Sequence, residues 1–69
     1  MSQNINESIY DIEKAIEQLP VKYKTIVILY YYDLMPTKEI AKVLNLSDAA
    51  VRKRLERARL WMKEFIERN

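Results

Sequence analysis

Basic side chains gather in a short stretch of the C-terminal half, and their spacing indicates a surface for a polyanion. Five Arg or Lys residues fall between Arg52 and Arg59. A short amphipathic segment before them stops at Asn45, and Ser47 then offers a hydroxyl that can cap the next helix. Two helices joined by a short turn, the second helix basic, form a helix-turn-helix that enters the DNA major groove. We predict this motif at about residues 37–59; the alternative is an ordinary helical hairpin with a solvated charged face.

A helix that begins near Asp48 would have two distinct faces. The 3.6-residue period directs one apolar stripe to the core, namely Val51, Leu55, Ala58, Met62 and Phe65, with Ile66 at its margin. The opposite face in the first two turns holds Ala49, Arg52, Lys53 and Glu56, with Asp48 at the edge. Arg52 and Lys53 are the candidates for base contacts, because Arg and Lys donate to guanine O6 and N7. Glu56 either accepts from a cytosine N4 or pairs with Arg52, and we prefer the pair. Arg57 lies nearer the flank, where a phosphate is expected.

Length and composition restrict the chemistry available to the chain. With 69 residues the sequence predicts one small domain, in which the hydrophobic surplus over chain entropy is roughly 3 to 5 kcal/mol. The sequence has no Cys and no His, so disulfides, thiolate or imidazole metal sites and catalysis by these side chains are excluded. The lack of Gly argues against phosphate-cradling loops, and no nucleophile–base pair can be assembled. We therefore expect no enzyme, cofactor, metal site or small-molecule substrate.

Apolar spacing and turn residues predict an all-α, four-helix domain. A first helix ends at Pro20, which is well placed in the first turn of the second helix. The next segment, residues 21–33, is rich in β-branched and aromatic residues, which locally favour a strand. Since no second strand exists to pair with it, we predict instead a helix that is buried on most sides. The third helix is expected at about residues 37–44 and the fourth at about residues 48–67.

The net charge of +2 conceals a difference between the two halves of the chain. Residues 1–33 carry three Lys against five acidic residues, a net −2, whereas residues 34–69 carry nine basic against five acidic residues, a net +4. This split indicates that the C-terminal half faces a polyanion. No signal peptide is visible, and the longest apolar run, residues 26–32, is far shorter than the ~20 residues that cross a bilayer. We expect a cytoplasmic protein without a membrane partner.

From about residue 15 to residue 66 the sequence resembles region four of bacterial RNA polymerase sigma factors, particularly the extracytoplasmic function group. The matching residues are Ala15-Ile-Glu-Gln-Leu-Pro20, Tyr23 and the apolar run through Tyr32, Lys38-Glu-Ile-Ala41, Val43-Leu44, Leu46-Ser47, Val51-Arg52 and Arg54-Leu-Glu-Arg-Ala-Arg59. Response-regulator output domains share the first half of this pattern but have a different second half of the recognition helix.

The resemblance implies a domain that binds the minus-thirty-five promoter element through its fourth helix and docks on the β flap of RNA polymerase through earlier helices. The positions that match the family's DNA-contacting stretch are Ser47, Asp48, Ala49, Ala50, Arg52 and Lys53. Lys38 and Lys42 match positions close to the DNA backbone. The expected partners are therefore double-stranded promoter DNA and the polymerase core, and an anti-sigma factor is a further candidate.

Three positions depart from the family pattern. Leu34 stands where Gly is usual, Pro36 where a capping Ser is frequent, and Ala50 where Thr is common, which removes a hydroxyl that could reach a phosphate. The promoter-melting region two of sigma factors has no counterpart here, and we expect an excised domain rather than a free-standing protein. Two other functions stay open: an adaptor that binds polymerase or an anti-sigma factor with little DNA binding, and a response-regulator-like output domain.

The second helix carries apolar or aromatic residues on nearly every side. A domain this small cannot readily enclose a helix completely, so part of this surface should stay exposed. Tyrosine suits a partner helix, because it provides contact area at low entropy cost and tolerates water. We predict that Tyr30 and Tyr31 help to dock the flap helix or an anti-sigma factor, with Tyr31 the best candidate for an exposed position. Alternatively, helices one and four cover the segment and the tyrosines only edge the core.

Overall fold

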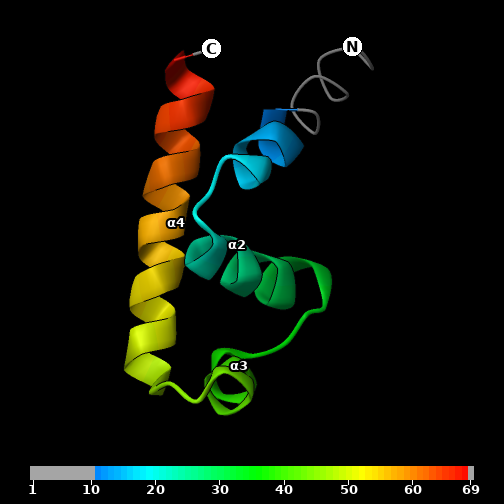
Figure 1. Cartoon of the computed structure of the whole chain (residues 1–69), viewed down its shortest axis with the longest axis vertical. Helices are drawn as coiled ribbons and strands as arrows, with labels where there is room; N and C mark the ends of the chain where they lie inside the picture. Colours follow the sequence, from blue (N-terminus) through cyan, green and yellow to red (C-terminus); the bar gives the residue numbers. More distant parts are fainter. Residues whose placement is uncertain (1–10, 69) are drawn as a thin grey trace.

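The computed structural model describes residues 11–68, which contain helices and no strand. The elements are a first helix described over residues 11–17, α2 over Val21–Val27, the π-helix η1 over Ile28–Tyr32, α3 over Thr37–Leu44 and α4 over Asp48–Arg68 (Figure 1). The predicted all-α, four-helix architecture is confirmed, including a helix rather than a strand in the β-branched segment. Within the described part of the chain, no helix is both long and apolar enough to cross a membrane.

Prolines stand at the start of two helices. Pro20 is the N-cap of α2 and Pro36 the N-cap of α3. The Pro20 carbonyl accepts from the N–H of Lys24 at 2.9 Å, and the Pro36 carbonyl from the N–H of Ile40 at 3.1 Å. Each proline precedes the first helical residue, where no intrahelical N–H bond is lost. We predicted Pro20 within the first turn of this helix, and it lies one residue before that turn.

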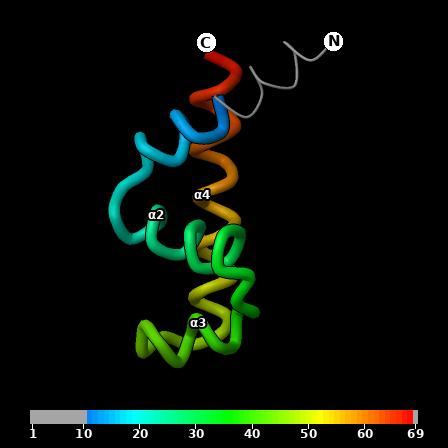
Figure 2. Tube along the Cα trace, turned by 90° about the vertical axis from the view of Figure 1, so that its right-hand side faces the viewer, coloured from blue at the N-terminus to red at the C-terminus, as the bar shows by residue number. Residues whose placement is uncertain are grey.

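The core consists of two clusters that share α2 and α4. One cluster lies towards the first helix and contains Ile16, Leu19, Tyr23, Val27 and Ala58. The other lies beneath the helix-turn-helix and contains Ile26, Ile40, Ala41, Val51 and Leu55. The adjacent residues Ile26 and Val27 enter different clusters, so α2 joins the two halves of the core. Figure 2 shows this arrangement, with the first helix and α3 towards opposite ends of α4 and α2 between them.

The helix that begins with α2 widens before it ends. The N–H of Asp33 donates to the carbonyl of Ile28 at 3.1 Å, a bond that spans five residues, as in a π-helix. Nothing in the apolar run of the sequence predicted this turn. Tyr31 and Tyr32 are exposed at its end, whereas Tyr30 is half-buried. The prediction that part of the second helix stays exposed is therefore confirmed.

Leu34 adopts a left-handed backbone conformation directly after η1. Its φ is 57°, and the N–H of Met35 reaches back to the carbonyl of Leu29 at 3.0 Å. In this conformation a Cβ crowds the following carbonyl oxygen, which is why Gly suits the position. The side chain of Leu34 is 80% exposed and compensates little through packing. The departure from Gly noted in the sequence is therefore a locally strained one.

Replacing Leu34 by Gly should stabilise the domain. Loss of the Cβ relieves about 1–2 kcal/mol of left-handed strain, and the larger freedom of Gly in the unfolded chain offsets about 0.5–1 kcal/mol of this gain. We expect a net increase in the free energy of unfolding of up to about 1.5 kcal/mol, measured by urea denaturation. Leu34→Ala keeps the Cβ and serves as the control. A Gly variant no more stable than the Ala variant would contradict the prediction.

Candidate nucleic-acid interface

The turn between α3 and α4 is closed by backbone hydrogen bonds around Asn45. This residue is left-handed, with φ 56° and ψ 48°, a conformation that Asn tolerates better than most residues. The N–H of Leu46 donates to the carbonyl of Ala41 at 2.8 Å, and the N–H of Asn45 to that of Lys42 at 3.3 Å. This pair of bonds is a Schellman motif, and Leu46 packs on the cluster that contains Ala41. The turn thus has a fixed geometry.

Ser47 caps the start of α4, as predicted. The N–H of Ala50 donates to Oγ of Ser47 at 3.1 Å, and the N–H of Val51 to its carbonyl at 3.1 Å. These bonds satisfy donors that have no partner within the helix. Ala50 was predicted to bind DNA. Its side chain is half-buried and its N–H is bonded to Ser47, so few of its atoms are available to a ligand. Ser47 itself is exposed and keeps its hydroxyl proton for a phosphate oxygen.

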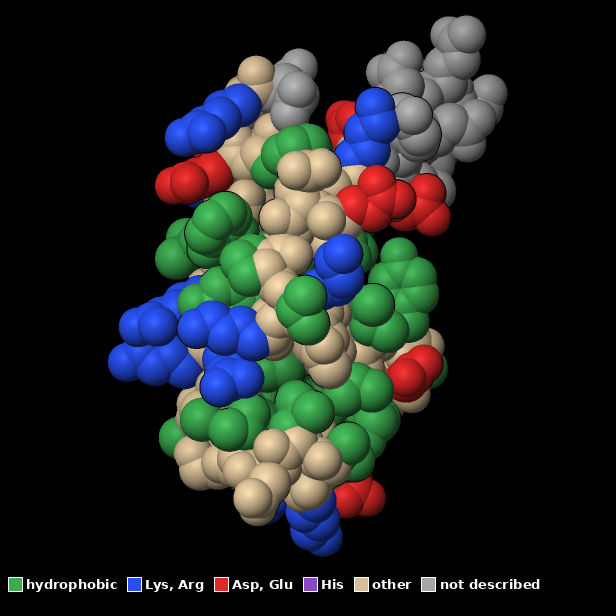
Figure 3. Space-filling view, viewed as in Figure 1, with side chains coloured by type: hydrophobic (Ala, Val, Ile, Leu, Met, Phe, Trp, Pro, Cys, Tyr) green, Lys and Arg blue, Asp and Glu red, His purple; other side chains and the backbone are tan. Residues whose placement is uncertain are grey.

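The faces of α4 are arranged as its periodicity predicted. Val51, Leu55 and Ala58 are buried, while Met62 and Phe65 are half-buried and Ile66 is exposed. On the other side, a shallow hollow is lined by Ala49, Arg52, Lys53 and Glu56. The structure therefore brings together the four side chains expected to face a groove. Lys and Arg side chains gather along the α4 side of the molecule in the space-filling view (Figure 3).

Arg52 is held by Asp48, one turn earlier in α4. Its Nε lies 3.2 Å from Oδ2 of Asp48, whereas Oδ1 is buried with no hydrogen-bond partner among residues 11–68. The predicted pairing of Arg52 with Glu56 is wrong, because the carboxylate at the positive end of the helix dipole takes this place. Because Asp48 approaches Nε, the terminal nitrogens of this exposed guanidinium can still make a bidentate contact. Glu56 stays in the hollow as an acceptor.

The predicted backbone contacts lie outside this hollow. Lys38 and Lys42 are exposed on α3, and Nζ of Lys42 lies 3.8 Å from Oε2 of Glu39. Exposed pairs of this kind contribute about 0–1 kcal/mol, so a phosphate oxygen can replace the carboxylate at little cost. Arg57 is exposed on the flank of α4, as predicted. Exposed cations thus lie on both helices of the helix-turn-helix.

The tyrosines at the end of the second helix lie in different environments. Tyr30 packs on the core cluster beneath the helix-turn-helix and meets the ring of Tyr31 edge to face, with ring centroids 4.8 Å apart. Tyr31 is 45% exposed, and its hydroxyl accepts a hydrogen bond of 2.7 Å from Nε of Arg59 on α4. Tyr32 is 58% exposed. Tyr31 is exposed, as predicted, although Arg59 covers part of it and Tyr32 is the more exposed of the two.

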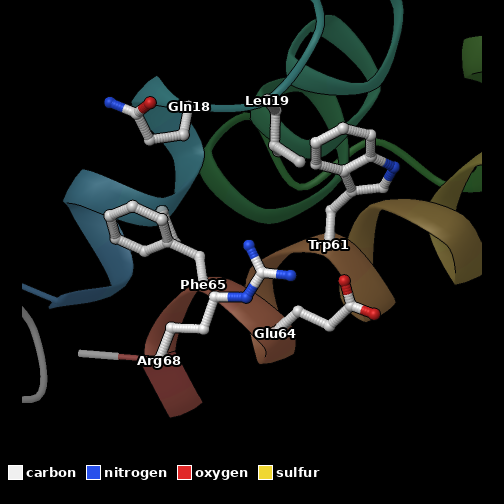
Figure 4. A pocket seen from close by; sticks show the side chains of 7 residues that line it. Gln18, Leu19, Trp61, Glu64, Phe65 and Arg68 are labelled. Atoms are coloured by element: carbon white, nitrogen blue, oxygen red, sulfur yellow. The ribbon is translucent and has the colours of Figure 1, made fainter.

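A groove between the first helix and the end of α4 was missed by the sequence analysis. It is lined by Ala15, Gln18, Leu19, Trp61, Glu64, Phe65 and Arg68. Figure 4 shows the rings of Trp61 and Phe65 on the α4 side of this recess. Trp61 is 51% exposed and Leu60 57% exposed. Their position outside the apolar stripe of α4 was the available signal, since large apolar residues there must cover a second surface.

Two helices joined by a closed turn, with cations exposed on the first half of the second helix, define a nucleic-acid-binding domain of the helix-turn-helix class. Residues 9–62 match the family described as Sigma-70, region 4, and the chain belongs to this family. The match confirms the resemblance found in the sequence. Residues 11–68 contain no group of three or more acidic side chains placed to hold a metal ion.

Three curated proteins are similar to the chain over most of its length. They are a probable RNA polymerase sigma factor, RfaY, of Xanthomonas campestris pv. campestris (45% identical over 56 residues), RNA polymerase sigma factor SigV of Bacillus subtilis (36% over 53 residues) and ECF RNA polymerase sigma factor SigW of Bacillus subtilis (38% over 48 residues). The matches cover 80%, 77% and 70% of this chain, but only 14%, 32% and 26% of the relatives. The chain thus spans less than a third of their length. No solved structure matches it.

Replacing Ser47 by Ala should destabilise the domain by about 1 kcal/mol, because the N–H of Ala50 loses its acceptor. In a domain of this size the melting temperature should fall by roughly 4–8 °C, measured by circular dichroism. Ser47→Asn is the matched control, since Asn caps a helix as well as Ser does. Equal melting temperatures for the Ala and Asn variants would show that the cap contributes nothing.

Proposed function

We propose that this domain binds the minus-thirty-five element of promoter DNA as region four of a sigma factor, and so directs RNA polymerase in transcription initiation. The hollow on α4 is the observation that carries the proposal, since its residues lie opposite the buried stripe of the same helix. A helix placed in the major groove by its N-terminal half would present this hollow to the base edges. Membership of the Sigma-70, region 4 family supports it.

The side chains of the hollow suggest how bases are read. Arg52 and Lys53 donate to O6 and N7 of guanine, with Arg52 oriented through Asp48. Glu56 accepts from N4 of cytosine, an assignment strengthened by its lack of pairing with Arg52. Ala49, which also lines the hollow, can contact a thymine methyl group. The proposed base-reading surface of α4 therefore combines two hydrogen-bond donors, one acceptor and one apolar contact.

Exposed cations on α3 and α4 would position the recognition helix on the phosphates. We assign this role to Lys38 and Lys42 on α3 and to Arg57 on α4, with the Ser47 hydroxyl as a neutral donor at the start of the helix. Each neutralised phosphate steepens the salt dependence, with a slope of about −0.9 per contact. One small domain with few contacts should therefore bind weakly and lose most binding as salt rises. This is a binding module and not an enzyme, and it works in the cytoplasm, where DNA and polymerase are.

Alanine substitutions should separate base reading from phosphate binding. Arg52→Ala or Lys53→Ala should cost about 1–3 kcal/mol of binding free energy and relax the preference at one or two base pairs. Lys42→Ala or Arg57→Ala should weaken binding evenly on all sequences and reduce the salt slope by about 1. The measurement is fluorescence anisotropy with a duplex selected by the parent domain from a randomised pool, and with an unrelated duplex.

The two pairs of variants act as controls for each other, because each removes one exposed cation. If the Arg52 and Lys53 variants bind both duplexes as the parent does, α4 is not the element that recognises the bases. Binding of the parent that is tight and insensitive to salt would instead favour a dimer, as in a response-regulator-like output domain. No binding of any duplex would favour the alternative of a polymerase or anti-sigma adaptor.

We further propose that the polymerase core docks on the exposed end of the second helix. Ile28, Tyr32 and Leu34 are exposed there, and a shallow hollow beside them is lined by Tyr30, Tyr31, Leu34, Met35 and Pro36. This surface is apolar with phenolic edges, which suits the apolar face of the β flap helix. An anti-sigma factor that covers the same residues would compete with polymerase for them.

Replacing Tyr32 by Glu should abolish binding of the β flap helix while the fold and DNA binding are retained. The reason is that a charge on the docking surface must lose its hydration when the partner binds. Isothermal titration with a flap-helix peptide measures the loss, and Trp61→Glu in the groove of Figure 4 is the comparison. If only the Trp61 variant loses the peptide, the groove is the docking site and the assignment of Tyr30 and Tyr31 is wrong.

A further inference from the structure

Among the contacts within residues 11–68, Arg59 is the one basic residue of the Arg52–Arg59 stretch that is held by another helix. Its Nε donates to the hydroxyl of Tyr31 at 2.7 Å, and its guanidinium carbon lies 5.8 Å from the centre of the Tyr31 ring. Tyr31 in turn is braced by Tyr30, whose ring meets it at 89°. The two contacts join residues 28 positions apart in the sequence and fix a long side chain that is otherwise exposed.

The hydrogen bond to Tyr31 leaves the two terminal nitrogens of the Arg59 guanidinium available. A guanidinium has five N–H groups, and only the one on Nε is used by Tyr31, so the four on the terminal nitrogens remain. Arg52 is likewise approached at Nε, by the carboxylate of Asp48 in an ion pair at 3.2 Å. At Arg59 the terminal fork, which matches two oxygens of a phosphate, has no hydrogen-bond acceptor among residues 11–68.

Arg59 lies on the same side of α4 as Arg52. The two residues are seven positions apart. At about 100° per residue their side chains point in directions that differ by only about 20°, and the rise between their Cα atoms is about 10.5 Å. The B-DNA major groove is about 12 Å wide. If the first turns of α4 lie in the groove at Arg52, a side chain about 10.5 Å further along the helix reaches the phosphates at its edge.

We propose that Arg59 is a phosphate-binding residue and that the hydroxyl of Tyr31 is a positioning residue that orients its guanidinium towards the DNA backbone. This inference rests on the proposed function, in which α4 lies in the major groove. It gives Tyr31 a role in DNA binding besides the predicted role in partner docking. The gain in binding free energy comes from order. An Arg side chain that is held before binding loses less conformational freedom when its terminal nitrogens bind a phosphate.

The test is a double-mutant cycle on the full chain. Tyr31→Phe removes the hydroxyl and keeps the ring, and it should weaken binding to a selected duplex and to an unrelated duplex alike, by roughly two- to tenfold. Arg59→Ala should weaken binding at least as much and reduce the salt slope by about 1. In the Arg59→Ala background, Tyr31→Phe should have no further effect, because its only route to the phosphate is gone.

Tyr23→Phe is the matched control. It removes a hydroxyl from α2 for which residues 11–68 supply no hydrogen-bond partner, and it should leave affinity unchanged. Circular dichroism establishes that all variants fold.

The outcomes distinguish this inference from the proposed function. If the parent binds and Tyr31→Phe binds equally well, only the inference is overturned. It is also overturned if Tyr31→Phe weakens binding just as much in the Arg59→Ala background, or if it weakens the selected duplex alone. A parent domain that binds neither duplex overturns both.

Discussion

The rotation of α4 about its own axis is the constraint on which the candidate interface depends. Val51 and Ala58 are 0% exposed and Leu55 is 2% exposed, and together they pack on both clusters of the core. With this stripe buried, the side chains of Arg52 and Lys53 have to face away from the protein. Turning the helix by one residue would place a charge in the apolar core, which costs several kcal/mol unless it is paired. The packing of three small and branched side chains thus fixes which residues meet a ligand.

The second helix connects this packing to both functions proposed for the domain. Ile26 and Val27 join the two clusters, and the π-turn that follows carries Tyr31 to Arg59. The exposed surface around Tyr32 and the cation on α4 are therefore parts of one continuous structure. From the sequence, the tyrosines and the fourth helix were expected to form separate surfaces. The hydrogen bond between Tyr31 and Arg59 shows that they are in contact.

What could be predicted from sequence was local. The bounds of α3, the start of α4 at Asp48 and the cap at Ser47 follow from apolar period and side-chain chemistry within one or two turns. The partner of Arg52 was within reach as well, since Asp48 and Glu56 are each four residues away and only Asp48 lies at the positive helix end. The Tyr31–Arg59 bond and the groove at Trp61 could not be predicted, because each depends on where a distant helix packs. The left-handed turn at Leu34 was indicated only by the resemblance, which placed Gly there.

A small domain of this design gains from being tethered to a second contact. The DNA contacts proposed for it are few and exposed. An ion pair that a phosphate would have to displace, such as Lys42 with Glu39, is weak. Binding through these contacts alone is limited in affinity, because the loss of translational and rotational freedom is borne by one small surface. If the polymerase core holds the second helix, the hollow on α4 meets DNA at an effective concentration set by the assembly, and two weak contacts combine into a strong one. Selectivity then requires only that Arg52, Lys53 and Glu56 reject wrong bases, and not that they supply all of the binding free energy.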